Sequence, residues 1–258
     1  MSHRSRLEAA LVRDRWLIGG ALAVAVALSW AWIVPMAHDM YGAMSGSASW
    51  MMPAAWDARH DLLLLAMWIV MMVGMMLPSA APTLLIYAAV VRRTPQGNDI
   101  AARVYLFAAG YLVVWTVFSL LATVLQRLLA EGLLLSPMME LESPLVGGAL
   151  LIIAGVYQLT PLKRSCLGSC HSPAAFIASY WRPGRVGAWR MGLAHGRYCL
   201  GCCWALMLLL FVGGVMNLLW IAAITVFVLV EKLAPVRAQA GRLSGALLIG
   251  AGLWFATH

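Results

Sequence analysis

Long runs of apolar residues, separated by short polar segments, make up most of this chain. A helix needs roughly 20 apolar residues to cross about 30 Å of hydrocarbon, and several runs approach or exceed that length. Gly213, Gly214 and Asn217 predict a turn inside the longest run. The pattern predicts an all-α membrane protein, a polytopic bundle of about seven transmembrane helices. The expected spans cover residues 16–34, 62–91, 104–125, 145–162, two segments of 199–230, and 243–256.

Composition and charge support this interpretation. The chain has 258 residues, of which 63% are hydrophobic and 11% charged, a balance that excludes an ordinary soluble enzyme. Seven spans with a cytoplasmic N-terminus and an outer C-terminus place every Lys and Arg inside except Arg59 and Arg127. The basic surplus thus orients helices, and we set nucleic acid aside as a partner. We expect a single domain over residues 1–258, with an uncleaved first helix, in the bacterial inner (cytoplasmic) membrane.

The five cysteines are concentrated in residues 166–203, together with two histidines. The predicted topology places them on the cytoplasmic side, where thiols stay reduced, so metal binding or redox exchange is favoured over a structural disulfide. His195, Cys199 and Cys202 are spaced four and three residues apart, which places them on one helical face. The alternative is that these cysteines only pack as small hydrophobic residues. The predicted inner metal site comprises Cys166, Cys170, His195, Cys199 and Cys202, with Cys203 a further candidate.

Methionine gives a second signal. Met67, Met71 and Met75 form one stripe of the second predicted span, and thioethers suit monovalent copper. A methionine stripe also serves as plain packing in helix interfaces. Its position between the inner cysteines and an outer group of soft ligands favours a relay. The predicted outer capture site comprises His38, Met40, Met44 and His60.

Three motifs carry a resemblance to a known family. They are MWIVMMVGMMLPSAAP at 67–82, YQLTPLKRSCLGSC at 157–170 and MGLAHGRYCLGCCWALM at 191–207, followed by VGGVMNLLW and VLVEKLAP. With these motifs the chain resembles a bacterial family of unknown function whose members are predicted metal-binding integral membrane proteins. The resemblance covers the second to sixth predicted spans. It implies metal binding, and it assigns neither the metal nor an activity.

These observations favour a membrane protein that binds a soft transition metal, most simply copper, with zinc as the alternative ion. It would take the ion up or deliver it, with the lipid bilayer around it and a metallochaperone or membrane complex as a partner. A rival hypothesis is a membrane thiol oxidoreductase that cycles Cys199 and Cys202 between dithiol and disulfide. A third is a structural subunit with a zinc-stabilised loop. Because the chain has no phosphate-binding loop and no Ser/His/Asp arrangement, we expect binding or transport rather than catalysis.

Overall fold

The computed structural model describes residues 3–42, 46, 57–94, 99–136, 139–233 and 237–257. These residues are almost entirely helical, with an isolated β-bridge between Leu135 and Leu141. The all-α prediction is therefore confirmed. In chain order the helices are α1 (His3–Met40), α2 (Ala58–Arg92), α3 (Ile100–Glu131), α4 (Pro144–Leu159), α5 (Pro161–His171), α6 (Pro173–Tyr180), α7 (Gly184–Leu208), the 3-10 turn η3 (Leu209–Phe211), α8 (Leu218–Leu233) and α9 (Arg237–Thr257).

Four helices of the described residues are long and apolar enough to cross a membrane. They cover Val12–Met40, Ala58–Arg92, Ile100–Glu131 and Gly184–Phe211. The pair α4 and α5, bent by 66°, would make a fifth span if it is counted as one. Helix α8 has 16 residues, or about 24 Å at 1.5 Å per residue, which is short for a straight span. The count of seven and the orientation of the termini remain predictions.

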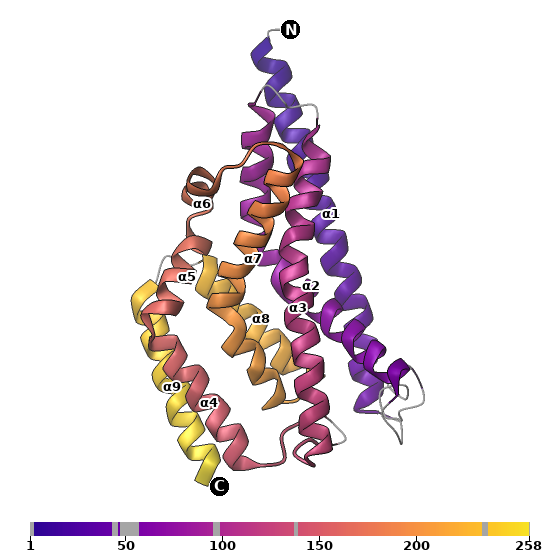
Figure 1. Cartoon of the computed structure of the whole chain (residues 1–258), viewed down its shortest axis with the longest axis vertical. Helices are drawn as coiled ribbons and strands as arrows, with labels where there is room; N and C mark the ends of the chain where they lie inside the picture. Colours follow the sequence, from indigo (N-terminus) through magenta and orange to yellow (C-terminus); the bar gives the residue numbers. More distant parts are fainter. Residues whose placement is uncertain are drawn as a thin grey trace.

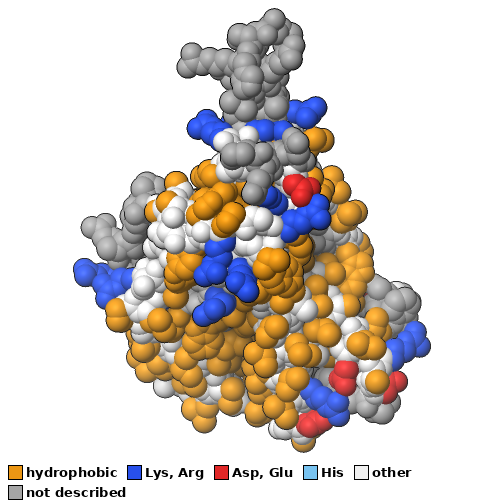
Figure 2. Space-filling model, turned by 45° about the horizontal axis from the view of Figure 1, so that its top comes forward, with side chains coloured by type: hydrophobic (Ala, Val, Ile, Leu, Met, Phe, Trp, Pro, Cys, Tyr) orange, Lys and Arg blue, Asp and Glu red, His pale blue; other side chains and the backbone are white. Residues whose placement is uncertain are grey.

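The long helices run roughly side by side, and the N- and C-termini lie at opposite ends of the molecule (Figure 1). Helices α1, α2 and α3 form one side, α7 packs on α3, and α4 pairs with α9 on the other side. Figure 2 shows a wide hydrophobic surface, with Lys and Arg side chains gathered towards the end that carries the N-terminus. An apolar surface of this extent is what a helical bundle surrounded by lipid requires.

Glycine allows two helix pairs to approach closely. A Cβ atom at Gly110 of α3 would lie 2.5 Å from the Trp189 carbonyl oxygen of α7. A Cβ atom at Gly148 of α4 would lie 2.6 Å from the Gly252 carbonyl oxygen of α9. Small residues at such crossings are typical of helix association in membranes. Because lipid tails are as apolar as the side chains, the helices associate there through close backbone packing rather than through the hydrophobic effect. The first of these crossings fixes α7, the cysteine-bearing helix, against α3.

Two sequence expectations need correction. The predicted fourth span continues to Leu162, but α4 ends at Leu159, because the residue before a proline disfavours helix and Pro161 starts a new one. Residues 163–198, which the span pattern leaves as a connection between the fourth and fifth predicted spans, are mostly helical, in α5, α6 and the first half of α7. Proline at the first position of α5 and α6 starts both short helices, and the Thr160 hydroxyl caps α5.

The predicted break near Gly214 is confirmed. Helix α7 ends at Leu208 and continues into η3, and α8 begins at Leu218. Gly214 has φ +92°, a conformation that strongly favours glycine. The Asn217 side chain accepts a hydrogen bond from the Trp220 amide at the start of α8. This turn sends α8 back along α7 and brings its far end to the cysteines.

Candidate metal centre

Helix α7 carries the central residues of the site. Its buried side chains include His195, Cys199, Cys202 and Cys203, as expected for one face of a helix that packs into the bundle. All five cysteines of the chain are free thiols. The predicted gathering of the cysteines is therefore present in space, and α5 adds Cys170 to it.

Four sulfur atoms form a continuous row from α5 into α7. The Cys170 and Cys202 Sγ atoms are 3.9 Å apart, and the Cys202 and Cys203 Sγ atoms are 3.3 Å apart. Cys203 lies one helical turn after Cys199 on α7 and interacts electrostatically with it. Two thiolates bound to one ion at about 2.3 Å, in trigonal or tetrahedral geometry, lie roughly 3.8–4.0 Å apart. The Cys170–Cys202 separation matches that spacing, and we call these four residues the sulfur row.

A complete metal site is not formed within the described ranges. No group of three or more His, Cys, Asp or Glu side chains there has the arrangement of an ion-binding cluster. The donor set nevertheless suits a soft ion, because thiols and thioethers are the soft ligands of proteins. The Cys170–Cys202 pair supplies two of the three or four ligands that such a geometry needs.

The last cysteine of the row meets a lysine. The Lys232 ammonium, at the end of α8, donates to the Cys199 Sγ at 2.8 Å and to the Ser79 hydroxyl of α2 at 3.1 Å. Lys232 is only 4% exposed and also interacts electrostatically with Cys170 and with the other thiols of the row. A buried cation is costly unless a negative group offsets it. The structure gives it two hydrogen-bond acceptors, the Cys199 sulfur and the Ser79 hydroxyl.

Tyr111 of α3 completes the surroundings of Cys199. Its hydroxyl donates to the Met76 carbonyl oxygen of α2 at 2.9 Å and lies 3.0 Å from the Cys199 Sγ. A phenol has one proton to donate, so with Met76 as the acceptor the Cys199 thiol is left to donate to the Tyr111 oxygen. Three helices thus meet at this one sulfur, which makes its position well defined.

Sequence reasoning missed Lys232 and Tyr111. The adjacent Glu231 and Lys232 suggest a local ion pair, and this expectation is wrong. Glu231 instead forms an ion pair with Lys163 of α5 at 2.7 Å, and Lys163 also hydrogen-bonds Gln158. The available signal was that the chain has two lysines, and that Lys232 ends an otherwise apolar helix within the VLVEKLAP motif.

The position of the site can be followed along α2. The cysteines were expected at or near the cytoplasmic ends of the helices. Ser79, which shares Lys232 with Cys199, lies 13 residues before Arg92, or about 20 Å along α2. The meeting point therefore lies near the middle of α2. Helix α7 begins at Gly184, and the cytoplasmic placement of the cysteines stays a prediction.

His195 and Cys166 stand apart from the row. The His195 ring lies among Phe107, Tyr111 and Phe176, with ring centroids 5.1–6.0 Å apart. Its Nδ1 atom is buried and has no hydrogen-bond partner among the described residues. The Cys166 sulfur lies against the backbone at Gly201 of α7. Both remain predicted ligands, and the structure places neither one in sulfur contact with the row.

The methionine stripe is buried. Met67, Met71 and Met75 are fully enclosed on α2, the helix that supplies Ser79 and the Met76 carbonyl oxygen. The stripe therefore faces the bundle interior and leads along α2 towards the sulfur row. This position suits both a relay for copper and ordinary packing.

The predicted outer site is only partly defined. Met40 and His60 are buried near the ends of α1 and α2, His38 is exposed, and Met44 lies outside the described residues. Beside them the Tyr41 hydroxyl donates to the Glu140 carboxylate at 3.0 Å. Burial and this hydrogen bond raise the pKa of Tyr41 to about 12. A shared capture site for a metal stays a prediction here.

Comparison with known proteins identifies the family. No curated protein and no solved structure gives a significant match to the chain. A family model described as "PpoB2: Copper chaperone" matches residues 65–255. The matched region runs from α2 to α9, so it includes the methionine stripe, the sulfur row and Lys232. The chain therefore belongs to the PpoB2 copper chaperone family.

Proposed function

We propose that this protein binds monovalent copper on the sulfur row inside a membrane-embedded helix bundle and passes the ion to a partner. The observation that carries the proposal is the Cys170–Cys202 pair at 3.9 Å, continued by Cys203 and Cys199 and ended by Lys232. Membership of a copper chaperone family supports the choice of metal.

Charge balance also supports monovalent copper. A monovalent ion on two thiolates carries one net negative charge, and the Lys232 ammonium offsets it. A neutral assembly is the form that a low-dielectric interior tolerates best. The lysine thus makes a two-thiolate copper site feasible at membrane depth.

The route of the ion extends the proposal. Copper would enter from the outer side near Met40 and His60, step along Met67, Met71 and Met75, and reach the row. Neutral thioethers hold monovalent copper weakly enough for it to move between sites. The N-terminus would lie in the cytoplasm of a bacterial cell, and a metallochaperone or membrane complex would receive the ion.

The test is the copper content of the detergent-purified full chain after growth with copper. A Cys170→Ser, Cys202→Ser double variant should lose the ion, because it removes both thiolates of the proposed pair. Cys166→Ser is the matched control, since this thiol also lies on α5 but outside the row. Equal copper in the wild type and the double variant would refute the site. Loss of copper in the Cys166→Ser variant alone would instead indicate that the ion binds at Cys166, beside Gly201.

A thiol oxidoreductase is the second candidate, and the structure changes its cysteine pair. The Cys199 sulfur is engaged by Lys232 and Tyr111, whereas the Cys170 and Cys202 sulfurs need approach only from 3.9 Å to about 2.05 Å to form a disulfide. Mass spectrometry after alkylation separates the candidates. A Cys170–Cys202 disulfide in the metal-free protein as isolated, with no copper bound in any growth medium, would favour redox exchange.

A further inference from the structure

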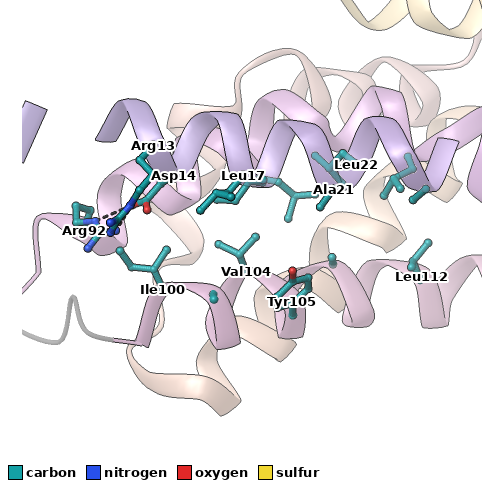
Figure 3. Close-up of a pocket in the computed structure, with 16 residues that line it drawn as sticks. Arg13, Asp14, Leu17, Ala21, Leu22, Arg92, Ile100, Val104, Tyr105 and Leu112 are labelled. Atoms are coloured by element: carbon teal, nitrogen blue, oxygen red, sulfur yellow. Dashed lines mark hydrogen bonds and ion pairs between the residues drawn. The ribbon is translucent and has the colours of Figure 1, made fainter. Parts of the chain in front are cut away.

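A groove between α1 and the α2–α3 pair is separate from the metal centre. Its volume is about 620 Å³, and its body is lined by apolar side chains of all three helices. Figure 3 shows Leu17, Ala21 and Leu22 of α1 facing Val104 and Leu112 of α3 across it. On α2, Leu77 and Leu84 line this groove. Their neighbours Met76 and Ser79 contact Tyr111 and Lys232 at the metal centre instead.

Charged side chains gather at one end of this groove. Arg13, Asp14 and Arg92 lie there together, and the Arg92 Nε donates to the Asp14 carboxylate at 2.7 Å (Figure 3). Asp14 therefore neutralises Arg92, and Arg13 forms no ion pair within the part of the chain that the structure describes. The mouth of the groove keeps one net positive charge.

A second groove repeats the arrangement. It has a volume of about 490 Å³ and lies along α1 and α2, with Arg15 and Arg93 at its polar end and Pro82, Leu85 and Ile86 along its body. Each groove thus has one arginine from α1 and one from α2 above an apolar body. Two charged mouths at the same level indicate a ligand with a negative head and a long apolar tail.

The length of the first groove matches one leaflet of a bilayer. Its lining on α1 extends from Arg13 to Ala25, and the twelve helical rises between them cover about 18 Å. Half of a hydrocarbon core of ~30 Å is about 15 Å. An acyl chain in the groove would therefore end near the bilayer centre, with its headgroup beside the arginines.

We propose that the groove between α1, α2 and α3 binds an anionic phospholipid, with the phosphate at Arg13 and one acyl chain along Leu17, Ala21 and Val104. Anionic lipid is favoured over zwitterionic lipid because the mouth is positive. Each arginine near an anionic lipid surface contributes roughly fivefold to affinity. The lipid would hold α1 against the rest of the bundle.

The test is native mass spectrometry of the full chain with phosphatidylglycerol or phosphatidylcholine added at equal concentration. The wild type should retain phosphatidylglycerol preferentially, and Arg13→Gln should reduce that retention roughly fivefold. Arg127→Gln is the control, because this arginine lies at the other end of the bundle and pairs with Asp61 and Glu131. Equal retention of the two lipids by the wild type would overturn the proposal.

A second pair of variants tests the groove itself. Ala21→Trp fills the groove, whereas Ala23→Trp adds the same bulk to an exposed position of α1 outside the lining. Only Ala21→Trp should lose the lipid, and both should keep their helical circular dichroism and copper content. Equal lipid loss in both variants would indicate only general contact of the helix surface with lipid. A quinone in the organic extract of the purified protein would indicate that a different molecule occupies the groove. Either result would overturn the proposal without affecting the copper site.

Discussion

Replacement of Lys232 by leucine tests the electrostatic design of the site. The Lys232 ammonium is 2.8 Å from the Cys199 Sγ and is almost fully buried. Lys232 also interacts electrostatically with Cys170 and Cys202, the proposed copper ligands, and removal of one member of a buried pair of opposite charges costs about 3–5 kcal/mol. Copper affinity should therefore fall by at least roughly 100-fold.

The assay is competition for monovalent copper with a chromophoric chelator in detergent, under anaerobic conditions. Leucine is preferred to methionine at this position because a new thioether would itself bind copper. Lys232→Arg keeps the charge and should retain most of the affinity. The double variant Lys163→Leu, Glu231→Gln removes the other buried lysine together with its partner, and it should bind as the wild type does. Unchanged affinity in Lys232→Leu would refute the charge argument.

Three further predictions concern the surroundings of the site. Tyr111→Phe removes the acceptor of the Cys199 thiol and the donor to the Met76 carbonyl oxygen, so the melting temperature should fall while the copper content stays the same, and a thermal melt of the detergent-purified protein reports it. Lys163→Leu alone leaves Glu231 buried without its cation, so the melting temperature should fall clearly, and Glu231→Gln added to it should restore part of the loss; no rescue would contradict the pairing. Gly252→Leu should separate α4 from α9 and lower the melting temperature, whereas Gly250→Leu, which meets open space, should not.

Much of the fold could be predicted because apolar length and turn residues act locally. The break at Gly214 and Asn217 is an example, since a positive φ and a helix cap are properties of those residues themselves. The bend after Leu159 was missed although Pro161 signals it, because the apolar pattern continues across the proline.

The candidate site was predictable in part. Helical spacing places Cys199, Cys202 and Cys203 on one buried face, and this part needs only the geometry of α7. Spacing cannot tell which distant helix contacts that face, so Lys232 and Tyr111 were missed. The same limit explains His195, whose position on α7 suggests a ligand, whereas its neighbours are aromatic rings.

The most direct measurement of the central claim is X-ray absorption at the copper edge on the full chain loaded with one equivalent of monovalent copper. Our account predicts at least two sulfur neighbours of copper, and fewer sulfur neighbours in the Cys170→Ser, Cys202→Ser variant. A shell of nitrogen and oxygen alone, or the same sulfur shell in that variant, would contradict it.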